Sequence, residues 1–324
     1  MSGRYEKEKK FENRINEKLK TSPSIMTDYC FYLTGSGKSF TTVYNYLNYV
    51  MSFAGFIYGE NCPEDFYNDI KSVHINKYIT SLRTKKVNGK SERTSDSIKT
   101  VHWSALNSFF QFLIPEYINE NPVSNTSRPK MKDKPNVTYL TEQEITKLLR
   151  YVEFNANDRM VNRDLCWLKL GFSTGLRVSA IVQIDIDDID FENNQIRVTE
   201  KGDYDEHILF GENLKKQLLL CIQDREKVCS DIQTNALFIS QVGNRLSVDM
   251  LSKMLKQYAG NVTKKKVTPH VMRHSCATNL YEKTGDIYLC SKQLHHKNVS
   301  TTERYAELSK TKQREATNIL DDLI

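Results

Sequence analysis

Paired cysteines, a signal-like N-terminus and long apolar runs are all missing from this chain of 324 residues. Its seven cysteines form no C-x-x-C pair, and an odd, scattered set suits buried thiols in a reducing cytoplasm better than disulfides or zinc. No apolar run approaches the roughly 20 residues of a membrane span, and the segment from Met1 to Lys20 is charged. We therefore expect a cytoplasmic protein with no membrane segment.

Internal repeats and low-complexity tracts are also lacking, and proline is scarce, with seven residues in all. Three of these prolines nevertheless fall at 122, 129 and 135, in a stretch with almost no large apolar residues. That composition is typical of a stiffened linker, made basic by Arg128, Lys130, Lys132 and Lys134. We therefore expect a leader at 1–21, a first domain at 22–118, a linker at 119–137 and a second domain at 138–324.

The positive charge is unevenly distributed between the two halves. Residues 1–135 hold 20 Lys and Arg against 14 Asp and Glu, whereas residues 136–324 hold 26 of each kind. The first part therefore carries the whole net charge of +6, as expected if it grips a polyanion. A slightly basic balance that only favours solubility would explain the same numbers.

Helical spacing dominates the first domain, where we expect four or five helices. Shorter helices are predicted at Met26–Leu33 and Val73–Leu82. The apolar residues that define the two longer helices are Val43, Tyr46, Leu47, Val50, Phe53, Ala54 and Ile57, followed by Ile98, Val101, Ala105, Leu106, Phe109, Phe110 and Leu113.

The second domain is also predicted to be mainly helical, with one small sheet. Thr141 and Glu144 form a capping box at the start of a helix. Two short strands are predicted around a turn at Lys201-Gly202-Asp203. The expected helices are Asp164–Phe172, Glu212–Val228, Ser247–Tyr258 and Pro269–Glu282, and the expected strands are Gln195–Thr199 and Glu206–Phe210.

Two arginines stand where helices are expected to begin. Arg177 follows the break Ser173–Gly175, which places it in the first turn of the next helix. Thr268-Pro269 is typical of a cap and first position, so His270 and Arg273 share one face at a helix N-terminus. Free N–H groups there favour phosphate, and guanidinium groups bind it bidentately. An H-x-x-R pair alone is common, and more often structural.

His296 and Tyr305 follow near the C-terminus. On one continuous helix, nine residues would place them on opposite faces. However, Asn298–Ser300 breaks the helix, and Ser300 to Glu303 forms another capping box. Tyr305 therefore sits early in a new helix. Because the chain has 17 tyrosines, packing alone would be the default interpretation of any one of them.

The order of these motifs is more informative than any single one. T-G-L-R-x-S at 174–179 is followed by H-x-x-R-H at 270–274, L-x-H at 294–296 and a tyrosine nine residues later. This set resembles the tyrosine recombinase (integrase) family over roughly residues 22–324. The resemblance implies a helical core-binding domain joined by the basic linker to a catalytic domain, together a clamp around duplex DNA.

The resemblance implies a covalent mechanism. Tyr305 resembles the nucleophile that attacks the scissile phosphate, which gives a 3′-phosphotyrosyl link and a free 5′-hydroxyl. Arg177 and Arg273 look like the arginines that clamp the non-bridging oxygens. Because the covalent link conserves the bond energy, neither ATP nor a metal is implied. We expect no cofactor, in agreement with the lack of clustered carboxylates or Cys/His ligands in the sequence.

Further roles follow from the same resemblance. His270 is similar to the family histidine that exchanges a proton with the nucleophile, and His296 to the histidine or tryptophan that contacts phosphate. His295 stands where the family usually has glycine, so it is the alternative for that contact. Ala180 replaces the glutamate that usually follows the motif serine.

Lys201 resembles the hairpin lysine that protonates the leaving 5′-oxygen. Its turn, Glu200–Glu206, holds four acidic residues and no further basic one. Repulsion from DNA would follow unless the turn becomes ordered on binding. An ordinary exposed hairpin lysine is the alternative.

Apolar residues also form a stripe near the end of the chain, at Ile319, Leu320, Leu323 and Ile324. In the family such a helix often docks into a neighbouring subunit, which implies a homo-tetramer on two DNA sites. Packing on its own domain is the alternative. An accessory DNA-bending protein is a further expected partner.

We therefore predict a nucleoid-associated, site-specific recombinase that integrates and excises a mobile element or resolves dimers. Two other classes compete. A type IB topoisomerase would relax DNA by similar chemistry without a specific site. An inactive DNA-binding protein would bind a duplex and form no covalent adduct.

Overall fold

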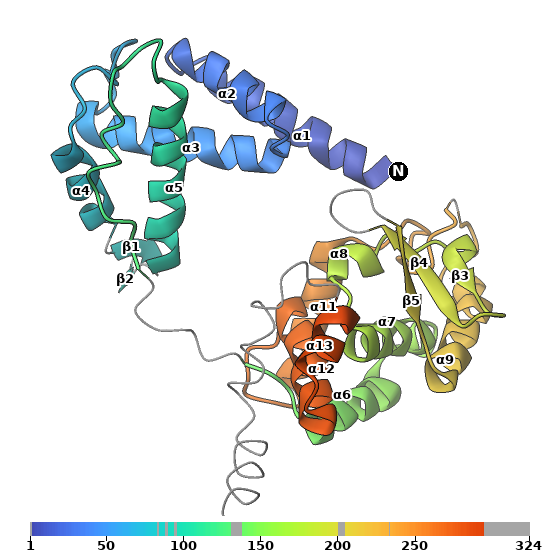
Figure 1. The fold of residues 1–324 in the computed structure, drawn as a ribbon. Helices are drawn as coiled ribbons and strands as arrows, with labels where there is room; N and C mark the ends of the chain where they lie inside the picture. The colour runs from blue at the N-terminus through green and yellow to red at the C-terminus, as the bar shows by residue number, and fades with distance from the viewer. Residues whose placement is uncertain are drawn as a thin grey trace, which may run out of the picture. The chain divides into compact units, whose positions relative to one another are not determined.

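The chain divides into two compact units, Met1–Lys134 and Pro135–Ile324, in the computed structural model (Figure 1). The structure describes residues 2–82, 84–87, 90–93, 96–130, 138–199, 205–232 and 234–294. Across these ranges, no helix is both long enough and apolar enough to cross a membrane. The division falls inside the segment 119–137, of which residues 131–137 lie outside the described ranges.

The N-terminal unit is helical and is built around aromatic side chains. Its core includes Phe53, Phe66 and Phe109, all buried, and the rings of Phe66 and Phe109 stack with centroids 5.6 Å apart. The predicted helices are present with small shifts at their ends. The elements are α1 (Ser2–Leu19), α2 (Ile25–Gly35), α3 (Phe40–Tyr58), α4 (Ser72–Ser81), β1 (Thr84–Val87), β2 (Lys90–Arg93) and α5 (Asp96–Phe112).

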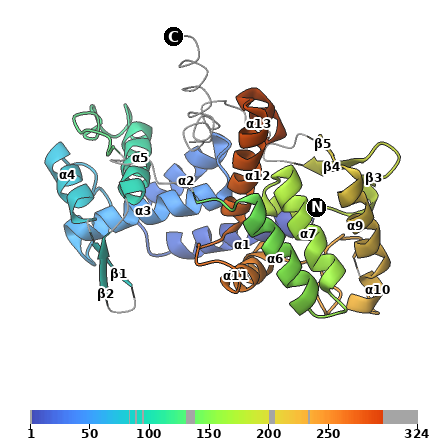
Figure 2. The same cartoon turned by 90° about the horizontal axis from the view of Figure 1, so that it is seen from below.

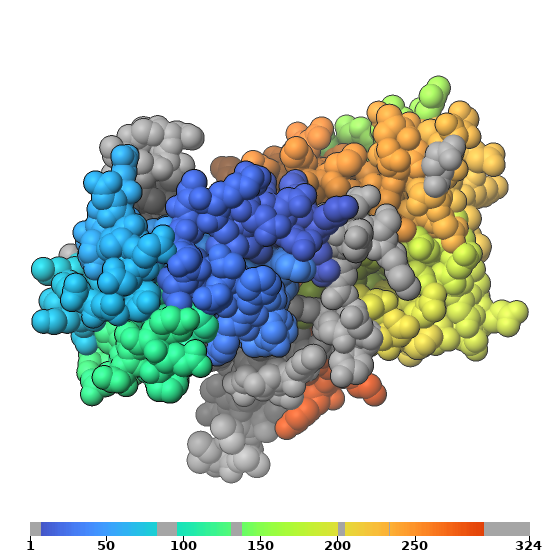
Figure 3. Space-filling view, turned by 90° about the horizontal axis from the view of Figure 1, so that it is seen from above, coloured from blue at the N-terminus to red at the C-terminus, as the bar shows by residue number. Residues whose placement is uncertain are grey.

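Helix α1 falls within the predicted leader, yet it packs on the rest of its unit. Ile15 is buried in the same apolar cluster as α2 and α3, and Leu19 is packed against that cluster. In Figure 3 the side chains of α1 and its neighbours form one continuous blue surface. The segment 1–21 therefore contributes to the core of the N-terminal unit.

The hairpin of β1 and β2 was not predicted. The strands pair antiparallel with Val87 opposite Lys90, and Figure 2 shows them extending away from the helices of their unit. The two residues between them, Asn88-Gly89, are the pair most favoured in two-residue hairpin loops. The sequence prediction missed this signal because the pair stands within a polar run.

The C-terminal unit packs helices around α7, which is buried along most of its length. Trp167 and Leu168 lie at the centre of its apolar cluster. The helices are α6 (Glu142–Asn155), α7 (Val161–Thr174), α8 (Val178–Ile181), α9 (Glu212–Gln223), α10 (Arg225–Val228), α11 (Val248–Gly260), α12 (Pro269–Thr284) and α13 (Ile287–Gln293). Thr141 and Glu144 form the predicted capping box of α6.

One small antiparallel sheet accompanies these helices, with strand order β3-β4-β5 (Figure 1). The mainly helical fold with a small sheet is confirmed. Two details differ from the sequence prediction: β3 is an additional strand, and the single helix predicted at Glu212–Val228 is interrupted at Asp224. The strands are β3 (Ile189–Asp190), β4 (Gln195–Thr199) and β5 (Asp205–Leu209).

Candidate active site

The turn between α7 and α8 presents Arg177, and Gly175 makes that turn possible. Gly175 caps α7 with a φ of +67°, a left-handed conformation that side chains disfavour. A Cβ atom there would lie 2.6 Å from the Leu294 side chain and 3.2 Å from Cys276 Sγ. Any other side chain would strain the backbone here and would require the end of the Leu294 side chain to move.

Arg177 is the N-cap residue of α8, one position before the predicted first turn. Its carbonyl accepts hydrogen bonds from the N–H groups of Ala180 and Ile181. These bonds fix the backbone of Arg177 and therefore the position of its Cα atom, from which the exposed side chain extends. Its position at a helix start is the one that favours phosphate binding.

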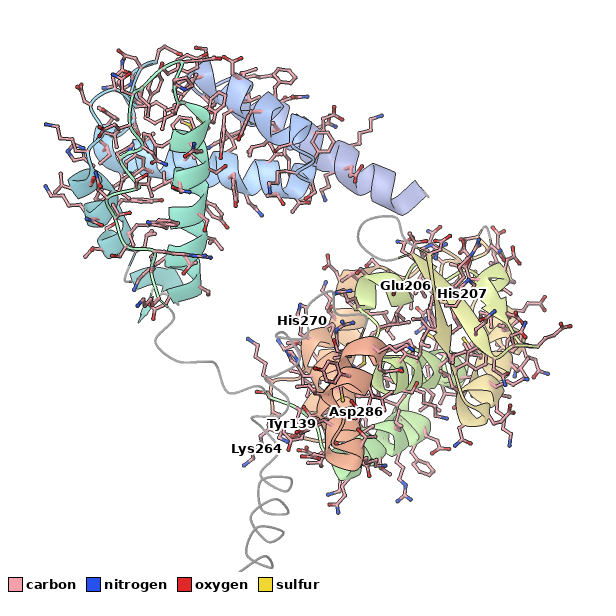
Figure 4. All side chains as sticks on the ribbon, viewed as in Figure 1. Tyr139, Glu206, His207, Lys264, His270 and Asp286 are labelled. Carbon is pink, nitrogen blue, oxygen red and sulfur yellow. The ribbon has the colours of Figure 1, made fainter. Side chains whose placement is uncertain are left out.

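Helix α12 carries His270 and Arg273. Thr268 caps the helix by accepting a hydrogen bond from Val271 N–H at 3.3 Å, and Pro269 occupies the first helical position. The predicted cap is therefore confirmed. His270 is exposed in the first turn (Figure 4), whereas Arg273, three residues later, is buried.

The guanidinium of Arg273 joins three segments. It donates to the carbonyl of Gly175 at 2.8 Å through Nη1, and to the carbonyl of Leu294 through Nη2. The side chain is 6% exposed, so these bonds form in a poorly solvated setting that strengthens them. Arg273 thus connects α12 to the Arg177 turn and to the end of α13.

Cys276 supports the same turn from within the protein. Its thiol donates to the carbonyl of Ser173 at 3.7 Å, and burial raises its pKa to about 12. A protonated thiol of this kind packs as a small apolar group and reacts poorly. The sequence prediction missed Cys276, and the only signal was its place one turn after Arg273.

The structure joins the Arg177 turn to helix α12, which carries His270 and Arg273, through the bond from Arg273 to the Gly175 carbonyl. The other predicted site residues, Lys201, His296 and Tyr305, lie outside the described residues. The last described residue, Leu294, precedes His296 by two positions, and its carbonyl is bonded to Arg273.

Strands β4 and β5 flank the segment that contains Lys201. Thr199 Oγ1 donates to Asp205 Oδ1 at 2.8 Å across the last strand pair, and Arg197 forms a 2.8 Å ion pair with Asp188. Glu206 and His207 of β5 are labelled in Figure 4. The paired strands therefore extend to Thr199 and Asp205, on either side of residues 200–204.

The chemistry of these residues suits an anion more than a metal. No cluster of three or more His, Cys, Asp or Glu side chains able to hold a metal occurs among the described residues. Arginine, in contrast, offers a permanent charge and a planar fork that matches phosphate oxygens. The exposed Arg177 and the buried Arg273 both carry this charge.

Comparison with known proteins agrees with this chemistry. The model of the phage integrase family matches residues 138–312, more than half of the chain. Tyrosine recombinase XerD of Staphylococcus haemolyticus is 33% identical over 220 residues, which is 66% of this chain and 73% of the relative. Tyrosine recombinase XerC of Vibrio vulnificus is 31% identical over 207 residues, 63% of this chain and 64% of the relative.

The fold is also found in solved structures. A crystal structure of the XerH site-specific recombinase bound to a palindromic difH substrate aligns with a TM-score of 0.70 at 22% identity. The alignment covers 96% of this chain and 89% of that one. Together with the matched family model, these likenesses place the chain in the phage integrase family, as a tyrosine recombinase that cleaves and rejoins DNA at specific sites.

Proposed function

We propose that this recombinase attacks the scissile phosphate with Tyr305 while Arg177 and Arg273 hold the two non-bridging oxygens. The tyrosyl oxygen forms a bond to phosphorus and the bond to the 5′-oxygen breaks, which leaves a 3′-phosphotyrosyl link. The observation that supports this assignment best is the pair of bonds from Arg273 to Gly175 and Leu294. They join the Arg177 turn to the segment that leads towards His296.

Proton transfer completes each step. A tyrosine with a reference pKa near 10 needs a base and a cationic setting to attack at neutral pH. His270, exposed in the first turn of α12, accepts that proton. Lys201 donates a proton to the leaving 5′-oxygen, and His296 contacts the phosphate. The free 5′-hydroxyl of a second strand then reverses the reaction and reseals the DNA.

Both units hold the duplex in this proposal. Residues 22–118 act as a core-binding domain, residues 119–137 as a basic linker and residues 138–324 as the catalytic domain. The excess of positive charge in the first 135 residues supports this division. Interactions with phosphate supply most of the affinity, so binding falls steeply as salt rises.

Assembly is proposed as a homo-tetramer on two DNA sites. A groove of about 700 Å³ on the C-terminal unit, hereafter the catalytic unit, provides an acceptor surface for an apolar segment. Its apolar lining comes from Ile145, Leu149, Phe172, Leu280 and Leu289. The stripe at residues 319–324 of a neighbouring copy has the matching character, and an accessory DNA-bending protein assists synapsis.

The biological role that we propose is integration and excision of a mobile element, or resolution of dimers, in the cytoplasm and on the nucleoid. All seven cysteines are free, which suits a reducing compartment.

The first test uses a nicked suicide duplex that carries the native site. The wild-type protein is expected to form a protein–DNA adduct stable to SDS, and Tyr305→Phe is expected to form none while it still binds the duplex. An adduct that persists in the variant would exclude Tyr305 as the nucleophile. Relaxation of plasmids that lack the site would favour a topoisomerase instead.

A further inference from the structure

The first described residues of the catalytic unit are bonded directly to helix α12. The N–H of Leu140 donates to the Ser275 hydroxyl at 2.8 Å, and the Leu140 carbonyl accepts from the Asn279 side-chain amide at 3.0 Å. Leu140 itself is buried in the main apolar cluster. Two side chains of one helix therefore satisfy both main-chain groups of a buried residue, as a neighbouring strand does in a sheet.

Tyr139, one residue earlier, is held at both ends. Lys265 Nζ donates to its carbonyl at 2.9 Å and to Glu144 at 2.6 Å, while the Tyr139 hydroxyl donates to Glu282 at 3.2 Å. Burial and the nearby Glu282 carboxylate raise the pKa of Tyr139, so its hydroxyl stays a donor. We use the name linker clip for Tyr139, Leu140, Ser275, Asn279 and Glu282.

The linker clip occupies the helix that bears the candidate catalytic residues. Ser275, Asn279 and Glu282 are spaced four and three residues apart and so share one face of α12. Asn279 also donates to the Ser275 carbonyl at 2.8 Å, which bonds the clip into the helix backbone. His270 and Arg273 lie within five residues of Ser275 in the sequence. His270 and Tyr139 are both labelled in Figure 4.

We propose that Ser275 and Asn279 are positioning residues for strand cleavage. By holding Leu140 they fix α12, and with it Arg273, to the chain just beyond the linker. The inference rests on the proposed function, since it assumes that Arg273 holds the phosphate.

Anchoring of Leu140 for stability alone is the competing explanation. It predicts that variants lose folding stability, DNA affinity and cleavage in parallel. A positioning role predicts a split, in which affinity for intact duplex is kept and the single-turnover cleavage rate falls. The split is expected because the clip meets α12 near Arg273, and a small displacement of a catalytic group slows the reacting step more than binding.

Asn279→Asp is the sharpest variant, because it keeps the shape of the side chain and removes both N–H donors. Asn155→Asp is the matched control, since it makes the same change in α6, where the Asn155 side-chain amide donates to the Tyr151 carbonyl of its own helix at 2.9 Å. In the full-length protein, we expect Asn279→Asp to bind duplex DNA within about twofold of wild type and to cleave a suicide duplex about tenfold more slowly. Asn155→Asp should match wild type in both.

Hydrogen exchange of residues 269–274 gives a readout that does not depend on activity. We expect Asn279→Asp and Asn279→Ala to exchange faster there than wild type, with unchanged exchange in α3 and α5. Wild-type exchange and cleavage in both variants would overturn the proposal, as would a loss of affinity equal to the loss of rate. If wild-type protein itself forms no adduct, the proposed function fails, and exchange alone then decides whether the clip positions α12.

Discussion

The two units bury different kinds of side chain. Among the described residues, the buried polar side chains of the N-terminal unit are His102 and Asn121. The catalytic unit buries many more. They are Arg163, Asp164, Thr174, Gln217, Asp224, Ser240, Arg273, Ser275, Thr278 and Ser291.

We attribute this difference to the roles proposed for the two units. A unit that grips phosphates through surface charge can rely on an apolar, largely aromatic core for its shape. A unit that orients a phosphodiester must fix a few groups precisely in space, and buried hydrogen bonds do this because removing either partner is costly. The catalytic unit accordingly contains Arg273 and Ser275, each bonded to main-chain groups of other segments.

The largest expected effect comes from Arg273→Ala in the catalytic unit. Cleavage of a suicide duplex should fall by about 10²–10³-fold. Stability should fall by about 1–3 kcal/mol for each buried carbonyl that loses its donor, at Gly175 and Leu294. Single-turnover kinetics and urea unfolding measure the two effects. Arg273→Lys, which keeps the charge, should still lose most of the rate, and near wild-type cleavage would refute the role of the fork.

Phe109→Ala tests whether the two units are independent in stability. Removing a fully buried ring from the N-terminal core should cost about 3–5 kcal/mol in that unit. Hydrogen exchange should rise in α2, α3 and α5 and stay unchanged in α7 and α12. Trp167→Ala is the reciprocal variant, expected to affect only the catalytic unit. Equal loss of protection in both units would show that they unfold together.

The uneven charge predicts a difference in salt dependence. Lys85, Lys86 and Lys90 belong to the β1–β2 hairpin of the basic unit. Replacing all three with alanine should lower the slope of log affinity against log salt by up to about 0.9 for each phosphate that is no longer neutralised. The same triple change at Lys147, Lys216 and Lys253 of the catalytic unit is the comparison. A larger decrease there would contradict the assignment of the polyanion grip to the first unit.

The smallest effect concerns pH and His102 in the N-terminal unit. Burial lowers the pKa of His102, which also shares a 2.8 Å hydrogen bond with the Tyr78 hydroxyl. The unfolded chain therefore binds the proton more readily than the folded one. Stability of this unit should be fully present above the unfolded pKa, about 6.5, and decline as pH falls below it. Unfolding of His102→Gln, followed from about pH 5 to about pH 8, should lack this dependence.

Local signals in the sequence were sufficient for much of the fold. The helices α3 and α5 follow from apolar spacing, and the starts of α6 and α12 from caps at Thr141 and Thr268. These features depend on residues a few positions apart, so the sequence alone determines them. The short strand β3 and the interruption at Asp224 were missed because both depend on distant partners. Asp224, for example, accepts a 2.6 Å hydrogen bond from Asn162.

In the candidate site, too, the sequence predicted the features that depend on local residues and missed those that depend on distant partners. The motif positions of Arg177, His270 and Arg273 could be read from the sequence, because residue type and spacing carry the signal. The partners of Arg273 could not, since Gly175 and Leu294 contribute backbone carbonyls, which every residue has. The Ser275–Leu140 bond joins residues 135 positions apart and leaves no local pattern. The proposed roles of Lys201, His296 and Tyr305 remain predictions.

Gly175 gives experimenters a way to separate chemistry from geometry. A Gly175→Ala variant retains every side chain that could touch a phosphate, and changes only the backbone turn and its fit against Leu294. Such a protein is a useful decoy in living cells, since it can occupy a recombination site with its reactive groups intact and misaligned. Suppressor substitutions that restore its activity would then map, residue by residue, the space into which the turn must fit.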